Sequence, residues 1–474
     1  MIRFRFITLL CFIMIEVSVF ADGIKPSSPN PFGNALIPDM IADASIQQFD
    51  GTFYCYATTD GYGKHLSTSG PPVLWKSEDF VNWQFCGNYF PSAVGQLYWA
   101  PSKVIPYNGK YYIYPTINHR IYPAVSDSPE GPFKLAKGED RFDQPNTSST
   151  LFESDKIQGI DAEVFIDDDG SRYVFWNKRK VAMLDESMTR LASEPIELPS
   201  PHKVYSEGPI FFKRGGIYYY LYTLGRDENY QYAYMYSKVS PMGPYIIPDE
   251  DIIATTDTAS CVFGPGHGTV FCVDGTDDWY FAFLEFSRRS TNRQTYVCKM
   301  EFNPDGTIRP IHVLMQGVGK LRKSPPKRML TVKSVSASSV KSSLWIKPNL
   351  DNRLNRIEYF NPQFVADGSN GSRWMADESD KSPWFTIDLG KRKYVEKSNI
   401  FFVRPTESHS YQLEVSEDGK NWKTICRYTD KLPQSPMTDY VGCNCRYLRV
   451  HIMEGVAGIW EWAIEGKSFK VYKP

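Results

Sequence analysis

The stretch FDGTFYCYATT, residues 49–59, joins a turn glycine directly to an aromatic-rich strand pattern. The same arrangement occurs four more times along the chain. The other copies are YNGKYYIYPTI (107–117), DDGSRYVFWNK (168–178), KRGGIYYYLYT (213–223) and VDGTDDWYFAFLE (273–285). Helical periodicity is nearly absent between them, and their spacing of roughly 45 to 60 residues matches a four-stranded sheet with its loops. The chain therefore predicts an all-β fold that begins with a five-bladed β-propeller.

Two further segments indicate that the blades are equivalent. AVSDSPEGPF (124–133) and YSKVSPMGPY (236–245) follow their glycine and strand units at similar offsets. Outer strands of corresponding blades would produce this spacing. We therefore expect both segments to form outer strands.

The repeat ends at about residue 318, where the sequence becomes basic and then rich in serine. Pro325 and Pro326 lie in this stretch, which is typical of a linker between domains. Short strand and turn patterns continue beyond it without the repeat. We expect a propeller domain over residues 22–318, a linker over 319–333 and a β-sandwich over 334–474.

Residues 1–21 have the composition of a secretory signal peptide. Two arginines precede an apolar run, and Val19 and Ala21 occupy the small-residue positions of a signal-peptidase site. Cys11 lies too early in the apolar run for the usual lipidated cysteine, although lipidation stays an alternative. No other stretch approaches the roughly 20 apolar residues of a membrane span. These features predict a secreted protein of the periplasm or cell surface of a bacterium.

The chain carries 53 Lys and Arg against 54 Asp and Glu, so its net charge of -1 gives no electrostatic basis for binding nucleic acid. Aromatic residues make up 15% of the chain, which suits a β-rich fold that stacks on sugars, although aromatics are also good strand formers. The eight cysteines beyond the signal peptide show no paired CxxC spacing for zinc. We expect Cys443 and Cys445 to be packed thiols.

Three acidic residues occupy the same place in three of the repeat units. Asp43, Asp161 and Glu207 each lie roughly 6 to 10 residues before the turn of their own hairpin. A propeller gathers the inner strands of its blades around a central channel, so residues near the starts of these strands converge. We therefore expect the three carboxylates to lie close together.

A cluster of this kind suits glycoside hydrolysis. One carboxylic acid protonates the leaving oxygen, while another carboxylate activates water or attacks carbon. A third carboxylate keeps the acid protonated, because crowded like charges disfavour further ionisation. Glu163 is an alternative to Asp161 as the inward residue. We expect residues 167–169 to form a turn and Glu285 to be packed or paired.

At these residues the sequence resembles glycoside hydrolase family 43, the five-bladed propeller hydrolases of arabinose- and xylose-containing polysaccharides. IADASI resembles the segment with the general base, here Asp43. IDAEVFIDDDG resembles the segment with the pKa-modulating aspartate, here Asp161, and SEGPIFF resembles the segment with the general acid, here Glu207. The resemblance covers roughly residues 30 to 318, and the order, spacing and repeat phase of the motifs agree. Ala44 departs from the proline that many members carry after the base.

The resemblance implies a single-displacement mechanism with inversion. Asp43 would deprotonate water, Glu207 would protonate the departing glycosidic oxygen, and Asp161 would keep Glu207 protonated and in place. Inversion needs room for the water molecule, so the carboxyl groups of base and acid would be about 6.5–9.5 Å apart. The chemistry itself requires no cofactor.

Three further segments resemble the substrate pocket of the family. Trp99 in WAPSK would help to wall the site, and Arg293 in SRRSTNRQTYVCKMEFNPDGTI would contact the substrate or the catalytic acid. Arg288 and Arg289 in the same segment are alternatives to Arg293. His267 in GPGHGTVF would face the central channel near a calcium ion or a water cluster, the alternative being a hydrogen-bonded histidine of the core.

The region from residue 330 to residue 474 resembles an F5/8 type C (discoidin-like) domain. The matching segments include FVADGSNGSRW (364–374), SPWFTIDLGK (382–391) and YQLEVSEDGKNWKTI (411–425). In this jelly-roll fold Trp374 and Trp384 would belong to the core. Asp367 and Glu461 match positions that often hold a structural calcium ion, a hard cation that prefers oxygen ligands. The domain would either bind glycans or serve only to pack against the propeller.

Together these features predict a secreted, exo-acting glycoside hydrolase with an accessory module, first of all an α-L-arabinofuranosidase acting on polysaccharide or oligosaccharide side chains. β-D-Galactofuranosidase and β-xylosidase activities are alternatives, because loops rather than the three carboxylates discriminate between sugar rings. An alternative of another class is a non-catalytic protein whose two domains both bind glycans. The intact set of Asp43, Asp161 and Glu207 argues against that alternative.

Overall fold

The computed structural model describes residues 30–62, 70–91, 97–137, 149–152, 159–289, 291–347 and 356–467. Its regular structure is β-strand apart from short 3₁₀ turns, so the all-β prediction is confirmed. The turns include η3 (Asp227–Asn229), η4 (Pro362–Ala366) and η5 (Pro405–Glu407). Over the described ranges, no helix has the length and apolar character needed to cross a membrane. The signal peptide predicted for residues 1–21 lies outside these ranges and stays a prediction.

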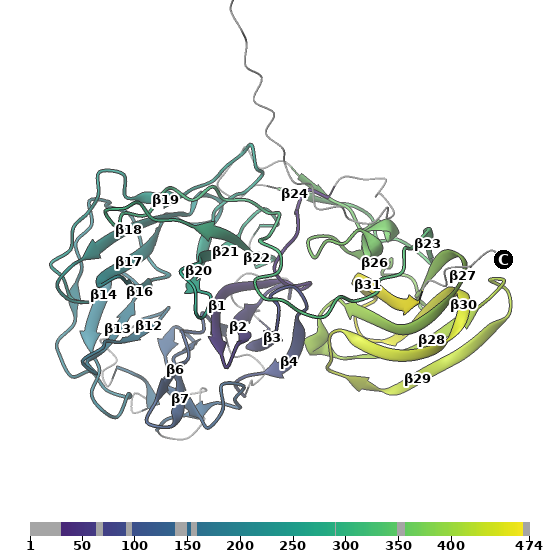
Figure 1. Cartoon of the computed structure of the whole chain (residues 1–474), viewed down its shortest axis with the longest axis horizontal. Coiled ribbons are helices and arrows are strands. Elements are labelled where there is room, and N and C mark those ends of the chain that lie inside the picture. Colours follow the sequence, from purple (N-terminus) through teal and green to yellow (C-terminus); the bar gives the residue numbers. More distant parts are fainter. Residues whose placement is uncertain are drawn as a thin grey trace, which may run out of the picture.

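Five antiparallel sheets form the blades of a propeller in the N-terminal part of the chain (Figure 1). Blade 1 contains β1 (Ile41–Phe49), β2 (Thr52–Thr59), β3 (Val73–Ser77) and β4 (Gln84–Asn88). Blade 2 contains β6 (Ile105–Tyr107), β7 (Lys110–Ile113), β10 (Ala124–Ser126) and β11 (Lys134–Leu135). A small separate sheet of β5 (Tyr98–Trp99), β8 (Thr116–Ile117) and β9 (Arg120–Ile121) accompanies blade 2.

The remaining blades follow in chain order. Blade 3 contains β12 (Glu163–Ile166), β13 (Arg172–Trp176), β14 (Lys180–Met183) and β15 (Ile196–Glu197). Blade 4 contains β16 (Ile210–Arg214), β17 (Ile217–Leu224), β18 (Gln231–Ser237) and β19 (Ile252–Ala254). Blade 5 has three strands, β20 (Gly266–Cys272), β21 (Trp279–Glu285) and β22 (Gln294–Met300). The predicted five blades are thus confirmed.

Each copy of the glycine and aromatic repeat forms the second strand of its blade, namely β2, β7, β13, β17 and β21. The aromatic side chains of these hairpins pack between neighbouring blades. Phe175 of blade 3 stacks on Phe211 of blade 4 with ring centroids 4.3 Å apart, and Phe53 of blade 1 meets Phe271 of blade 5 at 6.4 Å. The repeat therefore supplies both the strands and the contacts that close the ring. The predicted outer segment 124–133 begins with β10, and the segment 236–245 includes only the last two residues of β18. Both are third strands, and the outermost strands β11 and β19 follow these segments, so the prediction that the segments form outer strands was wrong.

A residue with a left-handed backbone stands near the start of each inner strand, from two residues into β1 to five residues ahead of β6. The residues and φ angles are Asp43 (51°), Ala100 (40°), Asp161 (61°), Gly208 (54°) and Gly264 (57°). Such a conformation costs a non-glycine residue about 1–2 kcal/mol, so surrounding contacts must hold it. The backbone N–H of Ala100 donates to Thr58 Oγ1 and that of Asp161 donates to Thr116 Oγ1. Thr58 belongs to blade 1 and Thr116 to the small sheet beside blade 2, so neighbouring sheets hold these two turns.

The C-terminal domain is a β-sandwich built largely from two long strands that curve across it. Its strands are β23 (Ser334–Ala337), β24 (Leu344–Ile346), β25 (Arg356–Glu358), β26 (Trp374–Met375), β27 (Trp384–Phe402), β28 (His409–Ser416), β29 (Trp422–Leu432), β30 (Met437–Glu454) and β31 (Gly458–Lys467). The main sheet runs β26-β31-β27-β30-β28-β29, with β23 paired to β27. Register shifts in the pairing of β27 with β30 mark the points where these strands bend.

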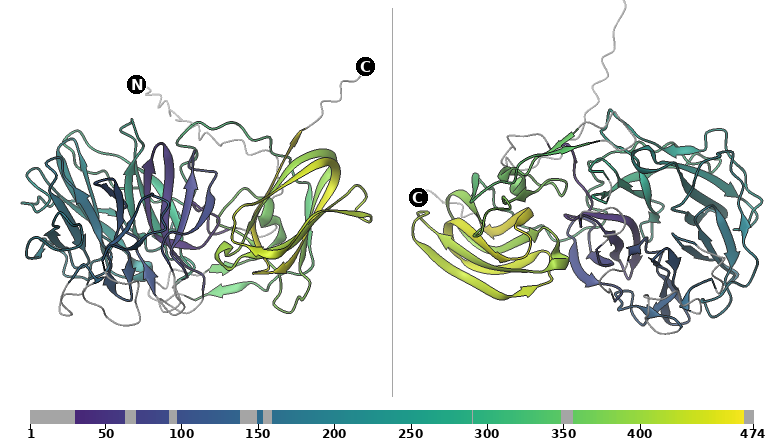
Figure 2. Two further views of the ribbon diagram at one scale, coloured as in Figure 1. Left: turned by 90° about the horizontal axis from the view of Figure 1, so that it is seen from below. Right: turned by 180° about the vertical axis from the view of Figure 1, so that it is seen from behind.

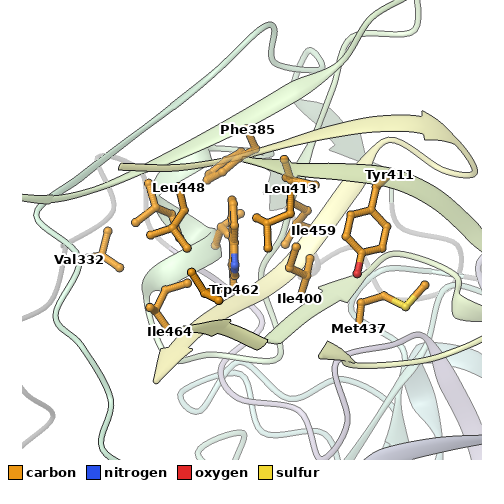
Figure 3. Close-up of a cluster of buried hydrophobic side chains, with 14 of the residues drawn as sticks. Val332, Phe385, Ile400, Tyr411, Leu413, Met437, Leu448, Ile459, Trp462 and Ile464 are labelled. Atoms are coloured by element: carbon orange, nitrogen blue, oxygen red, sulfur yellow. The ribbon is translucent and has the colours of Figure 1, made fainter. Parts of the chain in front are cut away.

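The core of the sandwich is shown in Figure 3, where Trp462, Phe385 and Leu448 lie together among aliphatic side chains. Trp374 is fully buried, as predicted, whereas Trp384 at the start of β27 is only partly buried and lies outside this core. Strand β27 enters the sandwich at Trp384, and burial becomes complete at the next residue, Phe385. The core prediction was therefore wrong for Trp384.

The sandwich lies beside the propeller (Figures 1 and 2), and a network of buried polar contacts joins the two domains. Arg288 of blade 5 donates from Nε to Glu358 Oε1 at 3.0 Å, and its guanidinium carbon lies 3.6 Å from the ring centroid of Phe32. Arg373 Nη1 lies 2.9 Å from the same Glu358 oxygen. Neutralising a buried carboxylate with two guanidinium groups offsets its desolvation. The propeller and the sandwich therefore share a buried, hydrogen-bonded interface in addition to the linker that joins them.

Candidate active site

The three predicted carboxylates lie together at the starts of the inner strands of blades 1, 3 and 4. His267 Nδ1, on β20 of blade 5, lies 3.8 Å from Asp43 Oδ1 and 3.7 Å from Asp161 Oδ2. Asp161 Oδ2 also accepts a hydrogen bond of 3.2 Å from the N–H of Gly208, the residue after Glu207. Four blades thus contribute to one cluster.

Asp43 is a buried carboxylate with two polar partners. Thr58 Oγ1 donates to Oδ2 at 2.8 Å, and Arg293 Nη1 lies 3.5 Å from Oδ1. The hydroxyl fixes the orientation of the carboxyl group, and the guanidinium lies beside its second oxygen. An oriented carboxyl group beside a cation is suited to the part of a general base.

Glu207 lies in the opposite electrostatic environment. Burial and then the nearby charge of Asp161 raise the pKa of Glu207 to about 7. The Tyr230 hydroxyl donates to Glu207 Oε1 and opposes this rise. Near neutral pH a large fraction of the molecules therefore carry a proton on Glu207, which a general acid requires.

Asp161 lies between these two groups. Burial, followed by the charge of Asp43, raises the pKa of Asp161 to about 7, and the N–H of Gly208 opposes the rise. The arrangement places a third carboxyl group where its charge favours the protonated form of Glu207. The role of pKa modulator that the family resemblance implies for Asp161 stays a prediction.

His267 occupies the centre of the cluster. Burial lowers the pKa of its imidazole, while Asp43 and Glu207 oppose that shift. A side chain at Gly208 would have its Cβ 3.0 Å from His267 Cγ, so glycine lets the chain carrying Glu207 approach the ring. In the described part of the chain, no three His, Cys, Asp or Glu side chains are grouped to hold a metal ion. Calcium near His267 therefore rests on the family resemblance alone.

Arg293 lies beside the predicted base rather than beside the predicted acid. Its Nε donates to Asp60 Oδ2 at 2.7 Å and its Nη2 to Asp60 Oδ1 at 3.1 Å. The third nitrogen, Nη1, is the one that faces Asp43. The sequence favoured a contact with the substrate or with Glu207, but the two carboxylate partners of Arg293 are both in blade 1.

Trp99 lies on β5, one residue before the left-handed Ala100. Its indole is buried, and its ring meets the edge of His119 at a centroid distance of 4.6 Å. The N–H of Ala100 donates to Thr58 Oγ1, which in turn donates to Asp43. Trp99 is thus one residue from the hydrogen bonds that orient Asp43, and its place in the wall of the site stays a prediction.

The alternative acidic residues have other partners. Glu163 Oε1 lies 2.7 Å from Lys103 Nζ and accepts the N–H of Phe211, so this carboxylate joins blades 2, 3 and 4. Glu285 accepts the N–H groups of Phe263 and Ser287. Asp161, rather than Glu163, is therefore the blade-3 carboxylate next to Asp43, and Glu285 is packed and hydrogen-bonded as predicted.

Three residues of the cluster, Thr58, Asp60 and Tyr230, were not among the predicted site residues. Asp60 directly follows the first repeat and precedes a glycine, a pattern that resembles an ordinary turn. Tyr230 is one of 30 tyrosines in the chain, many of which are core residues. One signal could have pointed to Asp60. It directly follows β2, the strand that pairs with the strand carrying Asp43.

A second pair of acidic side chains lies in the sandwich. Asp367 Oδ1 and Glu461 Oε1 both accept the N–H of Ser369, each at 2.9 Å. Burial raises the pKa of Asp367 to about 6, and burial together with the charge of Asp367 raises the pKa of Glu461 well above its usual range. These two carboxyl groups therefore lie close enough to share one donor, as ligands of a single cation would.

Comparison with known proteins places these features in a wider group. Residues 32–308 match the sequence model of glycosyl hydrolases family 43, and residues 334–464 match that of the F5/8 type C domain. A solved structure described as a glycoside hydrolase is 59% identical, with a TM-score of 0.90, and the match covers 92% of this chain and 100% of that one.

Two characterised relatives are more distant. The beta-D-galactofuranosidase xynD of Aspergillus niger is 27% identical over 314 residues, which cover 60% of this chain and 86% of that protein. The arabinoxylan arabinofuranohydrolase of Bacillus subtilis is 24% identical over 353 residues, which cover 62% of this chain and 66% of that protein.

Proposed function

Because the chain belongs to glycosyl hydrolase family 43 and joins its propeller to an F5/8 type C domain, we propose that it is an inverting, exo-acting furanosidase. It removes terminal α-L-arabinofuranosyl or β-D-galactofuranosyl units from glycan side chains. The observation that carries the proposal is the contrast between the surroundings of two carboxyl groups of one cluster. Asp43 faces the guanidinium of Arg293 at 3.5 Å, whereas burial and Asp161 raise the pKa of Glu207 to about 7.

In the proposed reaction Asp43 takes a proton from a water molecule as the water attacks the anomeric carbon. Glu207 gives its proton to the departing glycosidic oxygen, and Asp161 holds the pKa of Glu207 high enough for that proton to be present. Attack by water opposite the leaving group inverts the anomeric configuration. Two separate carboxyl groups in two opposite protonation states are what a single displacement requires.

The choice of furanose sugars is supported by the two characterised relatives, whose names specify a galactofuranosidase and an arabinofuranohydrolase. β-D-Galactofuranose differs from α-L-arabinofuranose by one exocyclic hydroxymethyl group. A single pocket that recognises the shared ring hydroxyls would therefore accept both sugars, and its depth at the exocyclic carbon would set the preference.

The test is hydrolysis of aryl α-L-arabinofuranoside, β-D-galactofuranoside and β-D-xyloside by the purified chain from residue 22 onward. Release from one or both furanosides, with NMR showing the inverted anomer first, is the expected result. Cleavage of the xyloside alone would replace the furanosidase proposal with a xylosidase. Inactivity on all three, combined with binding of a polysaccharide, would favour the non-catalytic alternative.

The pH dependence of kcat/KM should report the proton on Glu207. Its pKa is raised to about 7, so the acid form is present below that pH and is lost as the pH rises through it. We expect kcat/KM to fall tenfold per pH unit above about pH 7 on the alkaline limb. Initial rates between pH 5 and pH 9 check this, with circular dichroism at each pH as the control for folding. A rate that is constant up to pH 9 would contradict the assignment of Glu207 as the acid.

We propose that the Asp367 and Glu461 pair holds a structural calcium ion. Two carboxylates that share one donor supply hard oxygen ligands, and backbone and hydroxyl oxygens nearby would complete the six to eight that calcium takes. Calcium would offset the burial that raises the pKa of both groups and the charge of Asp367 that raises the pKa of Glu461 further.

The expected result is a higher Tm with calcium than with EDTA, because a ligand that binds only the folded state stabilises it. At a calcium concentration 100-fold above Kd the gain is about 2.7 kcal/mol. Calorimetry in calcium, magnesium and EDTA measures it, and the matched variant Asp367→Asn should no longer respond to calcium. An identical Tm in calcium and EDTA would contradict the proposal.

A further inference from the structure

The predicted base owes its position to a second carboxylate. Arg293 donates two hydrogen bonds from its guanidinium group to Asp60, from Nε to Oδ2 at 2.7 Å and from Nη2 to Oδ1 at 3.1 Å. The backbone N–H of Arg293 also donates to Asp60 Oδ2 at 2.9 Å. A bidentate pair of this kind fixes the plane of the guanidinium. With that plane fixed, the remaining nitrogen lies 3.5 Å from Asp43 Oδ1. Asp60 is therefore a positioning residue, since it acts on Asp43 through Arg293.

Asp60 belongs to a short segment, residues 60–62, that leaves the end of β2. The propeller holds its inner side, because the N–H of Asp60 donates to Met40 O at 2.8 Å and that of Gly61 to Thr291 O at 2.7 Å. Gly61 has a φ of 88°, which favours glycine, and a Cβ at this position would lie 3.0 Å from Met40 Sδ. The segment turns sharply here and presents its outer side to the sandwich.

A loop of the C-terminal domain holds that outer side. Arg404, the residue before η5, donates from Nη2 to Gly61 O, and its guanidinium carbon lies 4.7 Å from the centroid of the Tyr62 ring. The hydroxyl groups of Tyr62 and Thr406 are hydrogen-bonded to each other. Arg404 Nη1 also donates to Glu407 Oε1 at 2.9 Å, which holds the guanidinium group in place. We call these contacts of Arg404 and Thr406 with residues 61 and 62 the clamp. Three contacts from one loop thus fasten the segment that carries Asp60.

The sandwich also contacts the segment that carries Arg293. Arg293 lies in the connection between β21 and β22, and so does Arg288, which reaches the second domain at Glu358 and at the carbonyl oxygen of Gly371. Gln294, the neighbour of Arg293, donates to Asn370 O at 3.0 Å. Both partners of the ion pair beside the base are therefore on segments that the C-terminal domain grips.

We propose that the C-terminal domain is a working part of the catalytic centre, which positions the general base through Arg404, Asp60 and Arg293, rather than a detachable glycan-binding module. The inference rests on the proposed role of Asp43 as the base. Its physical basis is that a displacement of about 1 Å in a catalytic constellation costs on the order of 10²-fold in rate. Removing the contacts of Arg404 would allow residues 60–62 to move. Arg293 Nη1, which faces Asp43, would then move with Asp60.

The test uses three variants of the full chain. Arg404→Ala removes the contacts with Gly61 and Tyr62, and Tyr62→Phe removes only the hydroxyl contact with Thr406 while keeping the ring. Arg446→Ala is the matched control, because Arg446 makes a bidentate pair with Asp388 inside the same domain, at 2.8 and 2.9 Å. The Tm of each variant establishes that it is folded at the assay temperature.

The kinetic result expected for Arg404→Ala is a fall in kcat of about 10-fold with little change in KM, and a smaller fall for Tyr62→Phe. Arg404→Lys should recover part of the activity.

A crystal structure of Arg404→Ala provides a readout that is independent of the substrate. The expected change is a longer distance between Arg293 Nη1 and Asp43 Oδ1, with the pair between Asp60 and Arg293 shifted as a unit. Wild-type kcat and an unchanged distance in a folded Arg404→Ala protein would overturn the inference, and so would an equal loss in Arg446→Ala. If the wild-type protein hydrolyses none of the furanosides, the proposed function fails, yet the crystal structure still decides whether the domain positions Arg293.

Discussion

Replacing Glu207 with glutamine is expected to lower kcat on an accepted aryl furanoside by about 10²- to 10⁴-fold, the usual contribution of a general acid. Glutamine has nearly the shape of the protonated side chain and can still accept the hydrogen bond from Tyr230. It has no acidic proton for the departing oxygen. Substrate affinity should therefore change little, and calorimetric titration with an unhydrolysed oligosaccharide measures it beside the steady-state rates.

Varying the leaving group tests whether Glu207 acts as the general acid. A dinitrophenolate leaves without protonation, so the deficit of Glu207→Gln should shrink on a dinitrophenyl furanoside compared with a nitrophenyl or alkyl one. Asp169→Asn makes the same chemical change at an exposed turn and should retain wild-type activity. An E207Q deficit that is equal for all leaving groups would show that Glu207 acts in some way other than as the acid.

Replacing Asp43 with asparagine should cause a loss of similar size, about 10²- to 10⁴-fold in kcat, but one that is the same for every leaving group. The amide keeps the hydrogen bond with Thr58 Oγ1 but cannot remove a proton from water. Arg293 would then face a neutral group at the position where it now meets a carboxylate. Rates on the nitrophenyl and dinitrophenyl substrates distinguish the two variants.

Azide offers a direct check on Asp43, because it attacks carbon without needing a base. We expect azide to restore turnover of Asp43→Asn and to yield the glycosyl azide of inverted configuration, visible by NMR. Asp50→Asn, an exposed turn change at the opposite end of the same strand, is the matched control. Wild-type hydrolysis by D43N without azide would assign the base to another carboxylate of the cluster.

The sequence allowed the five blades and the convergence of three carboxylates to be predicted because both depend on local repetition. A turn glycine followed by alternating aromatics specifies a hairpin within about ten residues, and equivalent positions in successive blades then lie near one another. Asp43 and Asp161 stood at equivalent positions and Glu207 one residue before the corresponding Gly208, so their meeting required no knowledge of side-chain packing.

What escaped prediction depends on contacts between distant segments. Asp60 and Arg293 are 233 positions apart, and Arg404 and Gly61 are 343 apart. Neither separation follows any period of the sequence, so the orientation of Arg293 toward the base, and not toward the acid, could not be read from its motif. The burial of Trp384 was predicted wrongly for a related reason. Which residue of β27 is the first to be fully buried depends on where that strand enters the sandwich, and the motif around Trp384 does not specify this.

The left-handed residues near the starts of the five inner strands also show which side chains this backbone turn tolerates. At Ala100 and Asp161 a threonine of the neighbouring sheet holds the turn, so its geometry does not depend on one particular side chain. The same turn carries aspartate in blades 1 and 3, alanine ahead of blade 2 and glycine in blades 4 and 5. A single substitution there can therefore place a carboxylate near the centre of a propeller at a position whose backbone geometry is already fixed.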